Sequence, residues 1–293
     1  MAAPAEPTAK PASSLTPRLI SAAVLIPIVA LAAYAGKPAW DFLVIAFAAV
    51  MIGEWCQMAG RRRDPAHPGM RLPAPHPAPE TMVAVGLIVE GLVIFSREGY
   101  GWINPWAELA FGVAVTTLFA ALRHRAAALW FGLGIVYVAV PCAAIITLRG
   151  EPGIGLAQIL WIVVLVIAVD TGAYFAGRSI GGPKLAPTIS PKKTWAGLIG
   201  GLVAAAIVGA ATAALLGRPS PWPLALLSAG LAVVEQAGDL AESAFKRHFG
   251  VKDASHIIPG HGGAMDRVDG LVAVAVVVAG INIWSGSSVL TWL

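Results

Sequence analysis

Long apolar runs separated by short polar segments dominate the chain from residue 19 to residue 285. A run of about 20 apolar residues is long enough for a helix to cross the hydrocarbon core of a bilayer. The pattern therefore predicts an all-α, polytopic membrane protein with about nine transmembrane helices. The expected spans are 19–35, 40–59, 81–96, 103–122, 127–148, 156–177, 195–216, 221–245 and 267–285. The eighth apolar run continues past Phe245, which is longer than a bilayer requires, so its end should protrude or tilt.

Three regions follow from this pattern. Residues 1–17 are rich in Pro, Ala, Ser and Thr and should form a disordered N-terminal tail. Residues 18–150 should hold the N-terminal transmembrane helices, which could act as scaffold, lipid entrance or the surface of a homodimer. Residues 151–293 carry most of the charged motifs and should form the C-terminal transmembrane region in which the chemistry takes place.

The composition agrees with a membrane protein. Apolar residues make up 57% of the chain and charged residues only 12%, about half the charged fraction of a soluble domain. The spans are too apolar and the loops too short to offer a nucleic-acid-binding face. Cys56 and Cys142 lie in different apolar runs, so buried thiols are expected and no disulfide or metal framework follows.

Basic residues alternate between the loops. The loops after the second, fourth, sixth and eighth spans are rich in Lys and Arg, whereas each of the others holds one basic residue. The positive-inside rule places the basic loops in the cytoplasm, where nucleotides are. We predict an N-terminus outside, a C-terminus in the cytoplasm, and an active site that faces the cytoplasm from the inner (plasma) membrane of a bacterium.

The densest group of charged residues lies between Ser243 and Asp269, between two apolar runs. Just before it, Glu235, Asp239 and Glu242 follow an i, i+4, i+7 spacing that puts them on one face of a helix. Ionisable residues in or beside a membrane span are costly and usually functional.

A second polar region follows Asp170, at the end of the sixth apolar run. Arg178 comes two turns later, and Ser190, Lys192, Lys193 and Thr194 precede the seventh span. Ammonium groups and free backbone N–H groups at a helix start attract phosphates, and Thr194 could cap that helix. The alternative is a positive-inside loop with a capped helix, since neither common glycine-rich phosphate-loop pattern is present.

Three acidic residues at neighbouring span ends could hold a metal. Asp239 on the eighth span, with Asp266 and Asp269 at the start of the ninth, could converge on one hard cation. Carboxylate ligands with retained water suit Mg²⁺ and not Zn²⁺. For Asp269 the alternative is an ion pair with a lysine or Arg267. Glu54, Glu90 and Glu108 also lie in predicted spans and could face the bundle interior.

The stretch Ser243–Asp269, which reads S-x-F-K-R-x4-K-D-x-S-x2-I-P-x-H-G-G-x2-D-R-V-D, resembles the signature of phosphatidate cytidylyltransferases, also called CDP-diacylglycerol synthases. The segments D-T-G-A-Y-F-A-G-R and S-P-K-K-T-W, between Asp170 and Trp195, are similar to that family too. Ala264 stands where the family usually has a larger aliphatic residue. Ala196 stands where a glutamate commonly follows the K-K-T-W run, so a nucleotide or metal role for that glutamate is absent or moved here.

The resemblance implies a reaction in which CTP and phosphatidate give CDP-diacylglycerol and pyrophosphate in the lipid bilayer. It implies Mg²⁺ as the cofactor and allows a second, monovalent cation. The expected metal ligands are Asp239, Asp266 and Asp269. The other expected catalytic residues are basic: Lys246, Arg247, Lys252 and Arg267. The expected substrate-binding residues are Ser190, Lys192, Lys193, Thr194, Asp170, Arg178, Asp253, His261, Gly262 and Gly263.

Two other functions stay open from the sequence. A CTP-dependent kinase of a membrane alcohol would need a similar cation-rich site, but it would release CDP and a lipid phosphate. An ion-coupled transporter would also place acidic residues in its spans. The charged motifs cluster in one half of the chain, without the matching halves of a transporter with inverted repeats.

Overall fold

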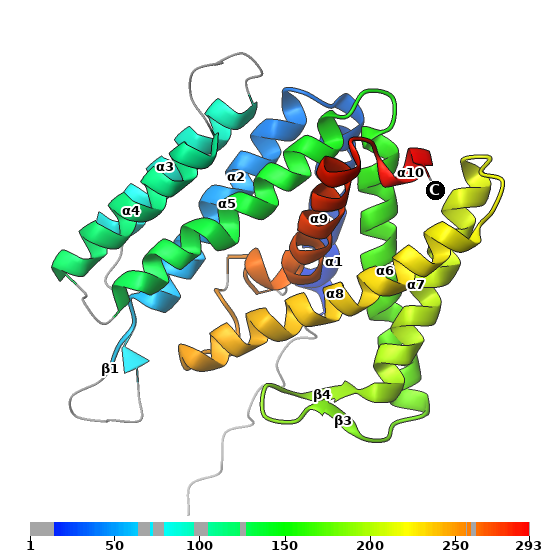
Figure 1. Ribbon diagram of the computed structural model, residues 1–293. Helices are drawn as coiled ribbons and strands as arrows, with labels where there is room; N and C mark the ends of the chain where they lie inside the picture. The colour runs from blue at the N-terminus through cyan, green and yellow to red at the C-terminus, as the bar shows by residue number, and fades with distance from the viewer. Residues whose placement is uncertain are drawn as a thin grey trace, which may run out of the picture.

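The computed structural model describes residues 15–63, 71–72, 79–96, 105–123, 127–255, 257–258 and 262–292. This part of the chain folds almost entirely into helices (Figure 1). The helices are α1 (Leu15–Ala35), α2 (Ala39–Ala59), α3 (Pro79–Ser96), α4 (Pro105–Arg123), α5 (Ala128–Gly150), α6 (Gly155–Ser179), α7 (Trp195–Leu215), α8 (Trp222–His248), α9 (Met265–Ser285) and α10 (Val289–Trp292). Each predicted span coincides with one of α1 to α9 to within a few residues. Two hairpins complete the described elements: β1 (Arg62–Arg63) with β2 (Arg71–Leu72), and β3 (Lys184–Ala186) with β4 (Ser190–Thr194).

The helices confirm an all-α, polytopic membrane protein. Within the described residues, six helices are long and apolar enough to cross a membrane, namely α2, α5, α6, α7, α8 and α9. Shorter apolar stretches lie in α1 and α4, at Ile20–Ala35 and Leu109–Leu122. The count of nine spans therefore stays a prediction. Residues 1–14 of the predicted tail lie outside the described residues.

The positions of the helix ends conflict with the predicted combination of a cytoplasmic hairpin, an N-terminus outside and a C-terminus in the cytoplasm. α6 separates the β3–β4 hairpin, which follows its C-terminal end, from the α5–α6 connection at its N-terminal end. At that connection, Arg149 Nε donates to the Ala33 carbonyl at the end of α1 (2.6 Å). Asn282, near the end of α9, donates to Glu151 Oε1 (2.8 Å). The start of α1 therefore lies on the hairpin side and the C-terminus on the opposite side (Figure 1). If the hairpin is cytoplasmic, the N-terminus is cytoplasmic and the C-terminus is not, which is the reverse of the prediction.

Close packing of α6 against α7 carries the β3–β4 hairpin. A Cβ on Gly172 would lie 2.7 Å from the Gly200 carbonyl oxygen and 2.8 Å from the Ala204 Cβ, so small residues let the two backbones approach, as is common between membrane helices. Gly181 and Gly182 follow α6 with φ of +69° and +92°, a left-handed backbone that only glycine adopts without strain. This turn leads from α6 into β3, which pairs antiparallel with β4, and β4 leads directly into α7.

Helices α8 and α9 approach closely beside their acidic residues. A Cβ on Gly238 would lie 2.6 Å from the Ala273 Cβ, and one on Gly270 would lie 2.7 Å from the Glu235 Cγ. α8 has 27 residues, about 40 Å at 1.5 Å per residue, and it crosses the bundle at an angle (Figure 1). The expected protrusion or tilt of the eighth span relative to the bilayer stays a prediction.

Aromatic side chains join the N-terminal helices to the C-terminal ones. The Trp55 ring on α2 lies 5.0 Å from Tyr137 on α5 and 5.2 Å from Phe245 on α8, measured between ring centroids. Trp55 is fully buried, and its Nε1 donates to the Trp130 carbonyl (2.7 Å). Burying large aromatic rings is strongly stabilising, so this cluster fixes α2 and α5 against the end of α8.

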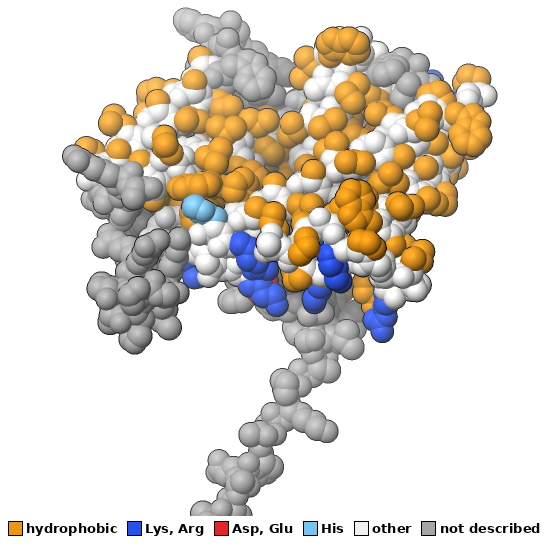
Figure 2. Space-filling model, turned by 60° about the horizontal axis from the view of Figure 1, so that its bottom comes forward, with side chains coloured by type: hydrophobic (Ala, Val, Ile, Leu, Met, Phe, Trp, Pro, Cys, Tyr) orange, Lys and Arg blue, Asp and Glu red, His pale blue; other side chains and the backbone are white. Residues whose placement is uncertain are grey.

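The surface matches a membrane environment. Leu160, Val164 and Ile167 form an exposed apolar stripe on α6, and Ile199, Val203 and Ile207 form another on α7. Figure 2 shows apolar side chains over most of one face and Lys and Arg side chains gathered along its lower edge. An apolar band with basic groups at one rim is the pattern expected where a bilayer meets water.

Candidate active site

A pocket of about 430 Å³ lies between α6, β4, α7 and α8. Six predicted site residues line it: Asp170, Arg178, Lys192, Lys193, Thr194 and Asp239. They come from separate segments of the chain, and the fold brings them to one concave surface. Thr194 Oγ1 accepts a hydrogen bond from the Gly197 N–H (3.0 Å), which confirms the predicted cap of α7.

Lys193 crosses this pocket from β4 to α8. Its ammonium group lies 2.6 Å from Asp239 Oδ2 and donates to Gln236 Oε1 (2.9 Å). Gln236 in turn donates to Glu235 Oε2 (2.7 Å), and Ser243 donates to Asp239 Oδ1 (3.2 Å). The lysine is therefore held in one position beside carboxylates, with part of its side chain still facing the pocket.

Lys246 links α8 to α9 in the same way. Its ammonium group donates to Glu242 Oε2 (3.0 Å) and to Asp266 Oδ1 (2.6 Å). Asp266 Oδ2 accepts from the backbone N–H groups of Ala254 and Gly263, both at 2.9 Å. Asp266 therefore fixes the α8–α9 loop to the first turn of α9, in addition to any role toward a metal.

Glu54 on α2 holds the same loop from the other side. It is fully buried, and its Oε1 accepts from the Ser255 hydroxyl and from the Ala264 N–H (2.8 Å). Its Oε2 accepts from the Met265 N–H (2.9 Å). A carboxylate at the start of α9 satisfies free N–H groups and is favoured by the helix dipole. Glu54 therefore connects the N-terminal helices to the charged stretch.

The acidic residues of α8 and α9 fit a magnesium site in their chemistry. The Asp269 carboxylate interacts electrostatically with those of Asp239 and Glu242, and Glu242 Oε1 is buried without a hydrogen-bond partner. Among the described residues, no three His, Cys, Asp or Glu side chains converge as a metal-binding group. Mg²⁺ often binds through one or two carboxylates plus substrate phosphates, so the donor chemistry fits. The set of Asp239, Asp266 and Asp269 stays a prediction.

Several other predicted residues lie outside the pocket. Ser190 begins β4, opposite Ala186. Arg247 donates to the Val251 carbonyl (2.9 Å) near the end of α8. Gly262 pairs with Ile258, and its φ of +93° requires a left-handed backbone. Three more are exposed at the α8–α9 loop or the start of α9: Lys252, Asp253 and Arg267. His261 lies outside the described residues, and the contribution of all these residues to binding stays a prediction.

Comparison with known proteins decides the family. A family profile described as "Cytidylyltransferase family" matches residues 16–283 of this chain. The chain belongs to this family. A phosphatidate cytidylyltransferase from Brucella suis biovar 1 (strain 1330) is 34% identical over 266 residues, covering 91% of this chain and 92% of the relative. Proteins with the same name from Haemophilus influenzae and Bacillus subtilis (strain 168) are 44% and 41% identical over 128 and 143 residues. These matches cover 42% and 48% of this chain, and 44% and 53% of the relatives.

The predicted resemblance is therefore confirmed, and this member of the cytidylyltransferase family is an enzyme, a nucleotidyltransferase of the CDP-diacylglycerol synthase family. The match runs from α1 almost to the end of α9, so the N-terminal helices belong to the family as much as the charged stretch does.

Sequence reasoning did not identify three residues of this site. Glu54 was one of several span carboxylates without an assigned contact. Gln236 cannot be identified from the sequence because a single glutamine in a span has no distinctive spacing. Tyr137, whose ring packs between those of Trp55 and Phe245, is in sequence one more aromatic residue in an apolar run. Only the packing of distant helices identifies these positions.

Proposed function

We propose that this enzyme transfers the cytidylyl group of CTP to phosphatidate, giving CDP-diacylglycerol and pyrophosphate. A phosphate oxygen of the lipid forms a bond with the α-phosphorus of CTP. The bond between that phosphorus and the oxygen leading to the β-phosphate breaks, and pyrophosphate leaves with that oxygen. The observation that carries the proposal is the pocket in which Lys193 lies against Asp239, in a chain whose relatives are named phosphatidate cytidylyltransferases.

The basic residues would bring two anions together. Lys192, Lys193 and Arg178 line the pocket, so they would bind the triphosphate and reduce its repulsion of the lipid phosphate. Because Gln236 and Asp239 already position Lys193, little reorganisation is needed when a phosphate displaces the carboxylate. Charge stabilisation by groups fixed in advance is the main source of catalysis in phosphoryl transfer. No protein nucleophile is needed, since the substrate phosphate attacks.

We also propose that the reaction depends on Mg²⁺ held by Asp239, Asp269 and Asp266. When bound, the ion would neutralise charge on the phosphates and polarise their oxygens. The protein's part would be to present Asp239 from α8 and Asp266 and Asp269 from the start of α9, with Lys246 fixing Asp266.

The site would face the cytoplasm. The β3–β4 hairpin and the last turn of α8 are basic, and basic segments at span ends stay on the cytoplasmic side. CTP would enter from the water, and phosphatidate would enter sideways from the inner leaflet.

Product analysis tests this proposal. Purified protein is incubated with CTP labelled in the cytidine ring, phosphatidate and Mg²⁺, and the lipid and aqueous products are separated. The proposal expects a labelled CDP-lipid and one pyrophosphate per lipid formed. Labelled CDP, formed with diacylglycerol or a polyprenol in place of phosphatidate, would identify a kinase instead. Absence of any CTP turnover would reject both.

A further inference from the structure

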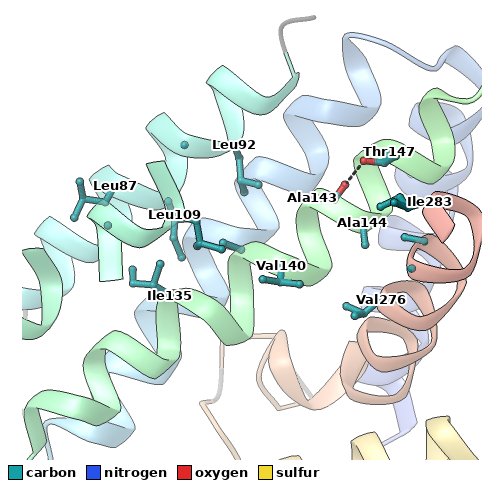
Figure 3. Close-up of a pocket in the computed structure, with 16 residues that line it drawn as sticks. Leu87, Leu92, Leu109, Ile135, Val140, Ala143, Ala144, Thr147, Val276 and Ile283 are labelled. Atoms are coloured by element: carbon teal, nitrogen blue, oxygen red, sulfur yellow. Dashed lines mark hydrogen bonds between the residues drawn. The ribbon is translucent and has the colours of Figure 1, made fainter. Parts of the chain in front are cut away.

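A slot between α3, α4, α5 and α9 forms a second cavity, of about 400 Å³ (Figure 3). α5 forms its floor, with α3 and α4 on one side and α9 on the other. None of the described residues that line it is charged. Thr147 lines the slot with a hydroxyl group, which already donates to the Ala143 carbonyl (2.9 Å). Such walls suit hydrocarbon, because a polar guest would lose its hydrogen bonds there.

The slot is too narrow for a helix of a second protein. Its α5 residues run from Ile135 to Thr147, about 18 Å at 1.5 Å per residue. A helix with its side chains is about 10–12 Å across, so it would fill roughly 1,400 Å³ over that length. The slot, with a cavity volume of about 400 Å³, is much smaller and suits one extended chain of methylene groups.

The slot also follows the helices that form the site. Asp269, Val276, Gly280 and Ile283 are spaced i, i+7, i+11 and i+14 along α9, which places them on one face. The last three line the slot, so it extends from about 10 Å to about 21 Å beyond Asp269. On α5, the Tyr137 ring packs on that of Phe245 near the end of α8, with 5.6 Å between centroids, and most slot residues of α5 follow it, from Ala139 to Thr147.

We propose that this slot receives one acyl chain of the lipid substrate, and that its far end, at Ile283, limits the chain length that the enzyme uses well. The inference rests on the proposed function. A lipid phosphate near Asp269 would place its chains in the nearer half of a hydrocarbon core of about 30 Å, along this face of α9. The four helices would then select the lipid by length, while the pocket at α6 to α8 binds the nucleotide.

Filling and lengthening the slot test the inference. A Cβ on Gly280 would meet nothing within 4 Å, so Gly280→Leu places a side chain in the slot without displacing its neighbours. Ile283→Ala removes a side chain at the far end that is 71% exposed, so the protein should still fold. The matched control is Gly86→Leu on α3, where a Cβ also meets nothing within 4 Å and which is not among the slot residues. Each enzyme is assayed with dioctanoyl and dipalmitoyl phosphatidate in mixed micelles.

The expected result is a change in chain-length preference. In Gly280→Leu, the kcat/KM for the long lipid should fall relative to the short one by about tenfold, the scale on which apolar pockets discriminate by size. In Ile283→Ala the ratio should move toward the long lipid, and in Gly86→Leu it should not move. The inference would be overturned if the ratio of kcat/KM for the long and the short lipid is unchanged in both slot variants, including the case in which kcat/KM falls equally for both lipids. If the wild-type enzyme turns over neither of the two lipids, the proposed function is rejected instead.

Discussion

Lys193 and Asp239 form an ion pair of 2.6 Å across the candidate active site, from strand β4 to helix α8. The two residues are 46 positions apart in the sequence, and the intervening α7 brings them together by packing on α8. In the proposed function, the lysine would exchange its carboxylate partner for a phosphate. The pair would then connect the packing of α7 on α8 to the binding of a nucleotide.

Lys193→Ala should impair the use of CTP. Loss of one fixed positive group at a reacting phosphate should lower kcat/KM for CTP by about 100-fold. Steady-state kinetics with CTP as the varied substrate measure this change. Lys184→Ala is the matched control, because Lys184 is exposed on β3 and does not line the pocket. If both variants keep wild-type KM and kcat, the basic hairpin serves membrane orientation alone.

Glu54→Ala should loosen the charged loop although Glu54 lies on α2. Three hydrogen-bond donors at Ser255, Ala264 and Met265 would lose their acceptor, and one buried unsatisfied group costs about 1–3 kcal/mol. We expect a fall of at least about 2 kcal/mol in the free energy of unfolding and a lower kcat. Thermal unfolding in detergent and kinetics measure the two effects.

Glu54→Gln separates the charge of this residue from its shape. The amide keeps one acceptor oxygen, so this variant should recover part of both stability and kcat. A Glu54→Ala protein as stable and active as the wild type would show that the loop does not depend on this contact.

Asp266→Asn should abolish pyrophosphate release while the protein stays folded and inserted in the membrane. A neutral amide is a weak ligand for Mg²⁺ and a poorer partner for Lys246. Its remaining oxygen can still accept from the Ala254 or Gly263 N–H, so the loop is only partly released. Near-normal turnover of this variant would remove Asp266 from the metal site.

The sequence predicted the helices well because each apolar run ends at glycine, proline or charged residues. It also predicted the capped start of α7, since Thr194 stands directly before that helix. Phosphate binding by Lys192 and Lys193 stays a prediction. It could not predict that Glu54 reaches Ala264, 210 residues away, because no local spacing encodes such a contact. The β3–β4 pairing was missed for a related reason, since its prolines and glycines predict a turn but not which residues pair.

The predicted termini and the predicted cytoplasmic side of the basic loops cannot both hold, for a geometric reason. The basic loops follow the even-numbered spans, so an odd number of spans places the C-terminus on the side opposite those loops, as the contacts of Asn282 with Glu151 indicate. That the hairpin lies on the cytoplasmic side is still a prediction, which rests on the positive charge of the hairpin.

Cysteine labelling tests this orientation. Thr188 is exposed in the β3–β4 turn, and Ser287 is exposed beyond the far end of α9. Native Cys56 and Cys142 are buried, so they should give a low background. A membrane-impermeant maleimide should label Thr188→Cys only from the cytoplasmic side and Ser287→Cys only from the opposite side. Labelling with the two sides exchanged would invert the topology.

The magnesium dependence of pyrophosphate release by Asp239→Asn, compared with the wild type, tests the central claim most directly. The claim is that carboxylates on α8 and α9 hold Mg²⁺ beside lysines so that two phosphates can react. Wild-type turnover of CTP and phosphatidate should stop with a chelator and return with Mg²⁺. Asp239→Asn, folded and inserted, should lose about 10³-fold in kcat, because a bound metal contributes several kcal/mol to such reactions. Wild-type turnover by this variant at the same Mg²⁺ concentration would contradict the account.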